Sequence, residues 1–159
     1  MEGRRKTLWS SSAATRAELS CSAHATEDEE KVLAALLNVV PENLREHYAQ
    51  AVKTTRTMGY HGNPITIYRL VVEGPDANKI FEHIASSLSE EDREYVDSTL
   101  GDRLEGRRLY IRVSKQWAYL GRLKVYEGDD VIKIIFTLRR SRAARTPAGG
   151  PGDAQAMQV

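Results

Sequence analysis

The chain has 159 residues, of which 41% are hydrophobic and 28% charged, with 23 Lys and Arg against 22 Asp and Glu. These values are typical of one soluble domain with a single core and exclude a highly charged unstructured chain. A membrane span, which needs about 18 apolar residues in a row, is also excluded. The single cysteine, Cys21, excludes an intramolecular disulfide and fits a reducing compartment. Too few apolar residues follow Arg4, Arg5 and Lys6 for a signal peptide, so we expect a cytoplasmic protein.

Both ends of the chain differ in composition from its middle. Residues 1–16 are polar, small and without an apolar period, which is typical of a flexible extension. Residues 141–159 accumulate Arg, Pro and Gly, which predicts a disordered tail whose first half is basic. We therefore expect one folded domain at residues 17–140.

The first half of this domain reads as strand, helix, strand and strand. Residues 17–25 alternate apolar and polar, which predicts a half-buried strand. Thr26 and Glu29 have the spacing of a capping box that opens a helix. Residues 48–58 predict a weak peripheral strand, and a turn then leads into a stronger strand at 65–72. The expected helix has its apolar residues on one face: Val32, Leu33, Leu36, Leu37 and Val40.

The second half reads as two helices and three strands. A helix carries Ile80, Phe81, Ile84 and Leu88 at helical spacing, and Ser89 with Asp92 caps a shorter helix that ends at Gly101. Three strands follow, at residues 107–114, 122–126 and 131–138.

The expected order is therefore β-α-β-β-α-α-β-β-β. Short turns between strands favour antiparallel pairing, and we predict an α+β fold with an antiparallel-rich mixed sheet and helices packed on one face. That arrangement leaves the other face of the sheet to water or to a ligand.

One segment near the C-terminus is strongly basic. Between Arg107 and Lys124 there are six cations and no acidic residue. Strand alternation places Leu109, Ile111 and Val113 in the core. The residues expected to point away from the core are Arg108, Tyr110, Arg112 and Ser114 in this strand, Arg122, Lys124 and Tyr126 in the next, and Lys133 and Arg139 at the end.

Such a face has two interpretations. Cations about 5 Å apart on neighbouring strands, with aromatic rings among them, suit a phosphate backbone with unstacked bases. Alternatively, the same residues form an ordinary solvated face, since Lys, Arg and Tyr are common there. The balanced charge of the whole chain does not choose between the two.

Residues 115–121 break the alternation and carry two aromatic residues. Trp117 and Tyr119 have the size and position to stack on bases. In the alternative, Trp117 and Leu120 close the end of the core and Tyr119 lies on the surface. We favour a core position for Leu120 and leave Trp117 open.

The sequence offers little for catalysis or metal binding. Cys21 and His24 have a metal-like spacing, but alternation puts them on opposite sides of a strand and no second ligand pair accompanies them. Asp129 and Asp130 follow Gly128 between two strands and read as turn residues. We expect no enzyme activity, metal or cofactor.

Four segments together resemble a known family. They are residues 24–28 (His-Ala-Thr-Glu-Asp), 59–64 (ending Gly-Asn-Pro), 115–121 (Lys-Gln-Trp-Ala-Tyr-Leu-Gly) and 128–132 (Gly-Asp-Asp-Val-Ile). In this order they resemble an archaeal family of small RNA-binding proteins labelled predicted exosome subunits. The likeness covers residues 17–139 and implies a fold like large ribosomal subunit protein five, which binds 5S rRNA. It also implies a role in RNA processing or degradation, or in ribosome biology, with exosome or ribosome components as partners. Ser114 and Trp117 depart from the family pattern, in which an acidic and a smaller residue stand at these places.

The working hypothesis is a non-enzymatic protein that binds single-stranded or structured RNA. Engaging five phosphates on a single strand predicts a log–log salt slope of about −3.5. One alternative is an accessory subunit that docks through the acidic segment Glu27–Lys31 and does not bind RNA; another is an RNA hydrolase. The predicted phosphate contacts are Arg108, Arg112, Lys115, Arg122 and Lys124, and the predicted stacking residues are Tyr110, Trp117 and Tyr119.

Overall fold

The computed structural model describes residues 7–59 and 61–139. Its centre is a six-stranded sheet in the order β2-β3-β1-β6-β5-β4, and every neighbouring pair is antiparallel. The strands are β1 (Ala14–His24), β2 (Lys53–Met58), β3 (Pro64–Glu73), β4 (Leu104–Glu105), β5 (Arg108–Ser114) and β6 (Val131–Leu138). The predicted α+β class is confirmed, whereas a mixed sheet was wrong for the strands described.

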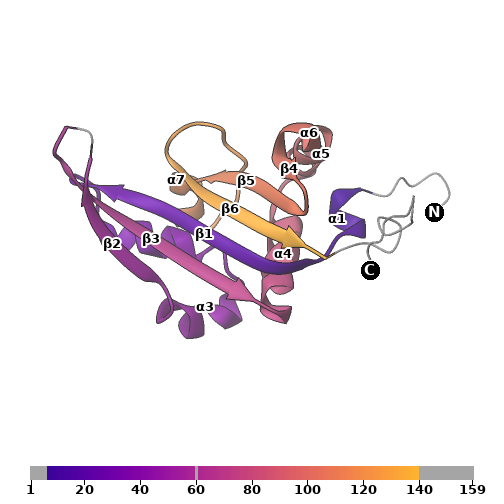
Figure 1. Ribbon diagram of the computed structural model, residues 1–159, viewed down its shortest axis with the longest axis horizontal. Helices are drawn as coiled ribbons and strands as arrows, with labels where there is room; N and C mark the ends of the chain where they lie inside the picture. The colour runs from indigo at the N-terminus through magenta and orange to yellow at the C-terminus, as the bar shows by residue number, and fades with distance from the viewer. Residues whose placement is uncertain (1–6, 60, 140–159) are drawn as a thin grey trace.

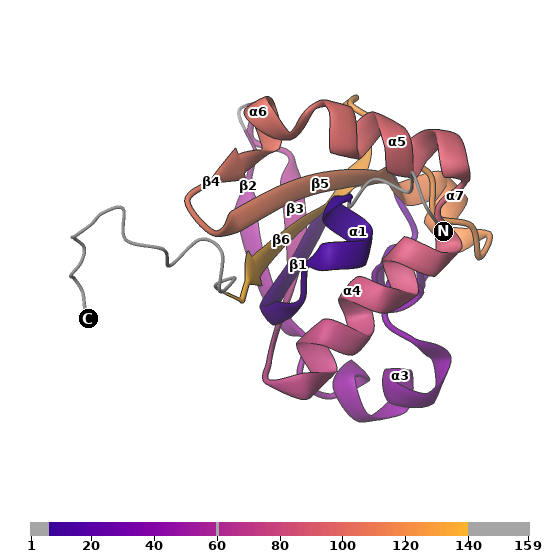
Figure 2. The ribbon, with the colours of Figure 1, turned by 90° about the vertical axis from the view of Figure 1, so that its right-hand side faces the viewer.

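The helices lie mainly on one side of this sheet. Figure 1 shows α4 behind the strands, and Figure 2, turned by 90°, shows α3 and α4 on the same side of β1, β3 and β6. The opposite side of the sheet, here called the open face, is turned to the viewer in Figure 1. The helices are α1 (Leu8–Ser11), α2 (Glu29–Leu37), α3 (Glu42–Ala49), α4 (Pro75–Ser87), α5 (Glu90–Ser98), α6 (Leu100–Arg103) and α7 (Lys115–Tyr119).

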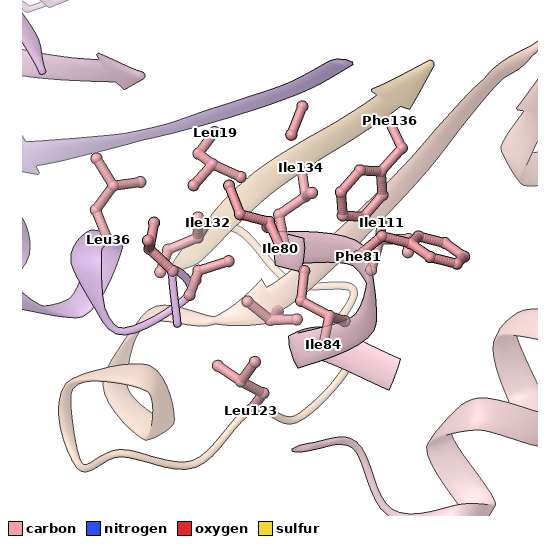
Figure 3. Close-up of a cluster of buried hydrophobic side chains, with 14 of the residues drawn as sticks. Leu19, Leu36, Ile80, Phe81, Ile84, Ile111, Leu123, Ile132, Ile134 and Phe136 are labelled. Carbon is pink, nitrogen blue, oxygen red and sulfur yellow. The ribbon is translucent and has the colours of Figure 1, made fainter. Parts of the chain in front are cut away.

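The core fills the space between the sheet and the helices. Ile80, Phe81 and Ile84 of α4 face the strands in Figure 3, with Leu19 of β1 and Phe136 of β6 among the side chains opposite. The rings of Phe81 and Phe136 meet edge to face, with their centroids 5.1 Å apart. Alternate strand residues are fully buried here, so the other half must face outward.

The N-terminal boundary differs from the prediction. We expected an unstructured extension to residue 16, but α1 and the first residues of β1 fall within it. The indole of Trp9 stacks on Phe81 at 5.3 Å between centroids, and its Nε1 donates a hydrogen bond to the Arg93 carbonyl. Leu8 is buried, and its backbone N–H donates to Asp97. Two apolar side chains therefore fix this segment against α4 and α5, whereas residues 1–6 and 140–159 lie outside the described residues.

Local signals were read correctly at α5 and wrongly at α2. The Ser89 hydroxyl accepts a hydrogen bond from the Asp92 N–H, as predicted. The cap of α2, in contrast, is Asp28, which accepts from the N–H of Glu30, so the predicted Thr26 box was wrong. The expected strand at 48–58 begins only at Lys53, because α3 occupies the residues before it.

The segment after β5 also differs from the prediction. Residues 115–119 form the helix α7. Its N-cap is Ser114, whose hydroxyl accepts a hydrogen bond from the Trp117 N–H. Residues 122–126 form no strand beyond one bridge between Val125 and Val113. Ser114 is therefore buried as a helix cap and does not point outward as alternation predicted. In the part of the chain that the structure describes, no helix is long and apolar enough to span a bilayer.

Candidate nucleic-acid interface

The strand register aligns cations from four strands across the open face. Lys53 pairs with Arg69, Arg69 with Ser20, Ser20 with Lys133, and Lys133 with Arg112. We call Lys53, Arg69, Lys133 and Arg112 the basic row. Since neighbouring strands lie about 4.8 Å apart, the row extends for about 19 Å. All four residues are exposed, and β2 and β5 supply its two ends.

Ion pairs on the open face converge on one carboxylate, Glu18. Its Oε1 lies 2.7 Å from Nη2 of Arg69, and its Oε2 lies 3.7 Å from Arg16 and 3.6 Å from Arg108. Glu18 is thus shared by three guanidinium groups, and its side chain is only 13% exposed. Among the described residues, Lys53, Arg112 and Lys133 of the basic row have no ion-pair partner, and two of these three are neighbours at the β5–β6 end.

A second basic group surrounds Trp117 on α7. The Nζ of Lys124 lies 3.9 Å from the centroid of the Trp117 ring, and the guanidinium of Arg122 lies 6.0 Å from it. Trp117 itself is 39% exposed. The N–H of Tyr126 donates to the carbonyl of Arg112, so this group adjoins the β5 end of the basic row.

Lys115 is not part of this surface. Its side chain is 7% exposed, and its Nζ lies 2.9 Å from Glu27 and 3.1 Å from Asp130, and donates to the Ser22 carbonyl. Burial alone would lower the pKa of Lys115, but these two carboxylates raise the pKa above its ordinary value. The ammonium is therefore charged and already neutralised inside the protein, and the predicted phosphate contact was wrong.

Tyr119 and Leu120 lie beside α2 and are not part of the group formed by Trp117, Arg122 and Lys124. The Tyr119 ring lies 5.6 Å from Nζ of Lys31 and lines a groove between α2 and α7. Leu120, expected in the core, is 66% exposed, and Leu123 is buried in its place. The helical turn of α7 explains this difference, since it carries Ala118 to the core and Leu120 outward.

The eight predicted site residues therefore fall into four places. Arg108, Tyr110 and Arg112 are on the open face, and Trp117, Arg122 and Lys124 form the adjoining group. Tyr119 lies in the groove, and Lys115 is buried.

Lys53, Arg69 and Lys133 were missing from the predicted site, although all three belong to the basic row; of these, only Lys133 was expected to point outward. Alternation in the segment 64–73 would have placed Arg69 outward, since Leu70 and Tyr68 are its buried neighbours. The alignment of Lys53 with Arg69 depends on the register between β2 and β3, which we could not predict from the sequence.

The described residues include neither a reactive thiol nor a metal-type cluster. Burial raises the pKa of the Cys21 thiol to about 12, so this group is neutral and a poor nucleophile near pH 7. Over the same residues no three His, Cys, Asp or Glu side chains gather as a metal site would require.

Comparisons with known proteins cover the same region as the sheet. A family model described as RNA binding matches residues 16–138. The uncharacterized protein MJ0213 of Methanocaldococcus jannaschii is 41% identical over 124 residues, 77% of this chain and 83% of that protein. The RNA-binding protein PAB1135 of Pyrococcus abyssi is 40% identical over 113 residues, 70% of this chain and 73% of that protein. The solved structure of Mth689, a DUF54 protein from Methanothermobacter thermautotrophicus, has a TM-score of 0.66 at 27% identity, covering 83% of this chain and 90% of that one.

Proposed function

The chain belongs to the family described as RNA binding, and from this premise we propose that it binds RNA on the open face of its sheet. The observation that supports this surface is the basic row, because its register aligns four exposed cations and three of them, Lys53, Arg112 and Lys133, lack a carboxylate partner within the described residues. Phosphates neutralised by such cations release counterions, which supplies most of a sequence-independent affinity.

We propose that the protein is not an enzyme and recognises mainly the backbone and the shape of the RNA. The basic row binds phosphates, and Lys124 and Arg122 extend the contact around Trp117. Half-buried Tyr110 and exposed Trp117 stack on bases where the strand is open.

The biological setting belongs to the same proposal. We place the protein in RNA processing or degradation with the exosome, or in ribosome biology, as its resemblance to the archaeal family implies. The likeness of its fold to ribosomal protein five is part of this proposal. Purification of the protein after crosslinking in cells, followed by sequencing of the bound RNA, distinguishes ribosomal RNA from exosome substrates.

The alternative of an acidic docking helix is disfavoured by the contacts of α2. Glu27 is paired with Lys115, and Glu29 accepts hydrogen bonds from Arg56 at 2.8 Å and Thr66 at 2.7 Å. These carboxylates already have cationic partners inside the protein, which weakens their attraction for a basic one.

A matched pair of charge reversals tests the proposed surface. Lys133→Glu changes the open face, while Lys79→Glu makes the same change on α4, across the core. We expect Lys133→Glu to weaken binding of an oligouridylate about tenfold or more at low salt and Lys79→Glu to leave it within about twofold, because phosphate attraction is local. Equal effects of the two reversals in fluorescence anisotropy would exclude the open face as the binding surface.

A further inference from the structure

A cleft lies where the open face meets α5 and α6. These two helices stand beside β4 and β5 in both views (Figures 1 and 2). The cleft has a volume of about 710 Å³, and Arg112 and Lys133 line it from the sheet, while Tyr95 and Arg103 line it from the helices. Ligand pockets are commonly of this size, which accommodates a nucleotide.

Two carboxylates line the cleft, those of Glu127 and Asp102, and that of Glu127 is held in place by Arg103. Arg103 is buried, and its Nη2 donates to Oε2 of Glu127 at 2.5 Å while its Nε donates to Oγ1 of Thr99 at 2.7 Å. The same guanidinium lies 5.2 Å from the Tyr95 ring centroid. Glu127 is nonetheless 49% exposed, and its Oε1 has no hydrogen bond from any residue that the structure describes. Arg103 thus orients a hydrogen-bond acceptor that stays open to a ligand.

Four other residues that line the cleft complement the parts of a nucleotide. Arg112 and Lys133 offer charge without an ion-pair partner in the described chain, which suits a phosphate. Tyr95, 45% exposed, and half-buried Tyr110 offer ring faces for a base.

The Glu127 carboxylate distinguishes among the bases. An ionised carboxylate only accepts hydrogen bonds, and each of its oxygens has two acceptor sites, so Oε2 is not exhausted by Arg103. Guanine presents two neighbouring donors, N1–H and N2–H, on its Watson–Crick edge. Uracil presents one donor between two carbonyl oxygens, and cytosine and adenine present an amino group next to an acceptor nitrogen. Guanine alone matches both oxygens of a carboxylate.

We propose that this cleft binds one guanine nucleotide of the RNA strand, with Glu127 accepting hydrogen bonds from N1–H and N2–H of the base. The phosphate lies at Arg112 and Lys133, and Tyr95 and Tyr110 contact the ring. This inference rests on the proposed RNA binding, which it extends from backbone contact to the reading of one base.

The test uses the full chain and eight-nucleotide oligouridylates that carry guanosine, inosine, adenosine or cytidine at one central position. Wild-type protein should bind the guanosine oligonucleotide about tenfold more tightly than the others, as expected of a bidentate contact. Inosine lacks the 2-amino group and should fall between guanosine and the other bases. The variant Glu127→Gln should lose the preference, whereas Glu94→Gln, the same change at an exposed position of α5 outside the cleft, should keep it.

Each outcome of this test decides one question. Equal binding of all oligonucleotides by the wild type overturns the guanine site and leaves RNA binding in place, while binding of none overturns both. A guanosine preference that survives in Glu127→Gln overturns the cleft as its origin. The inosine comparison needs no variant, so the site stays testable even if loss of the Arg103 contact unfolds Glu127→Gln.

Discussion

Glu18 is the one carboxylate on the open face that three arginines share. It lies next to Arg69 in an ion pair of 2.7 Å, with Arg16 and Arg108 within 3.7 Å. A phosphate that binds these guanidinium groups must compete with this internal anion. If RNA binds on the open face as proposed, Glu18 limits how strongly its β1–β3 part attracts phosphate.

Glu18→Gln should strengthen RNA binding. The change removes a competing charge of the same sign as phosphate and frees the three arginines, so the log–log salt slope should become steeper by about 0.7, the value for one additional phosphate contact. Glu73→Gln, at the exposed end of β3, is the matched control and should change the slope less. Unchanged or weaker binding by Glu18→Gln in anisotropy titrations would show that Glu18 does not compete with phosphate.

Lys115 should affect stability and leave RNA affinity almost unchanged. Removal of one partner from a buried ion pair costs about 3–5 kcal/mol, but Glu27 and Asp130 are partly exposed and stay hydrated, so Lys115→Ala should lower the free energy of unfolding by about 2 kcal/mol. Urea denaturation measures this loss. Lys133→Ala should show the reverse pattern, with normal stability and weaker RNA binding, and weaker binding by folded Lys115→Ala would contradict the structural role.

The stabilisation by this ion pair should depend on pH at both ends of the range. Burial would raise the pKa of Glu27, but the His24 N–H and Lys115 hold it below its ordinary 4.5, so its contribution is lost as pH falls through the lower folded value. Because the pKa of Lys115 is raised, its contribution to the free energy of unfolding is complete below the ordinary pKa of 10.5. This contribution is lost only as the pH rises through the higher pKa of the folded state. The difference in unfolding free energy between wild type and Lys115→Ala should thus stay constant from about pH 5 to 10 and shrink below about pH 4. A difference that is as large at about pH 3 as at about pH 5 would exclude the Glu27 carboxylate as its cause.

At the scale of elements, α7 separates residues that the sequence places together. Ser114 caps the helix, Ala118 enters the core, and Trp117 and Leu120 remain on the surface in different directions. Trp117 lies under Lys124, in whose segment the Tyr126 N–H donates to the Arg112 carbonyl of β5, whereas Tyr119 lies against α2. Of the two aromatic residues, Trp117 is the one to which the proposed binding mode assigns a contact with RNA.

Trp117→Ala should weaken binding of single-stranded RNA about five- to a hundredfold, since stacking of a base on an aromatic ring contributes about 1–3 kcal/mol. The wild-type fluorescence should be quenched by an oligouridylate, and the quenching should vanish in the variant, because the remaining Trp9 stacks on Phe81. Tyr119→Ala is the control and should retain both affinity and quenching. Quenching that persists without Trp117 would contradict this assignment.

Local patterns predicted the elements better than they predicted the site. Alternation placed Leu109, Ile111 and Val113 correctly in the core, and the spacing of Ser89 and Asp92 gave the cap of α5. The burial of Lys115 depends on Glu27, 88 residues earlier, and no local pattern records such a contact. The direction of Leu120 depends on α7, a helix too short to show an apolar period.

On the scale of the whole molecule, one side of the sheet packs against the core and the other side carries exposed charged side chains. Helices cover most of the apolar side, and the register of five strands brings distant cations onto one line from Lys53 to Arg112. Because this alignment depends on the whole sheet, a variant that unfolds the domain would lose RNA binding without informing on the surface. Variants of the basic row therefore require a melting curve beside each titration.

The salt dependence of RNA binding tests the central claim most directly. For a single-stranded oligonucleotide, the four cations of the basic row predict a log–log slope of about −3, and the double variant Arg112→Ala with Lys133→Ala should reduce its magnitude by about 1.4. A double variant that melts like the wild type and keeps the full slope, or a wild-type slope near zero, would contradict electrostatic binding of RNA on the open face.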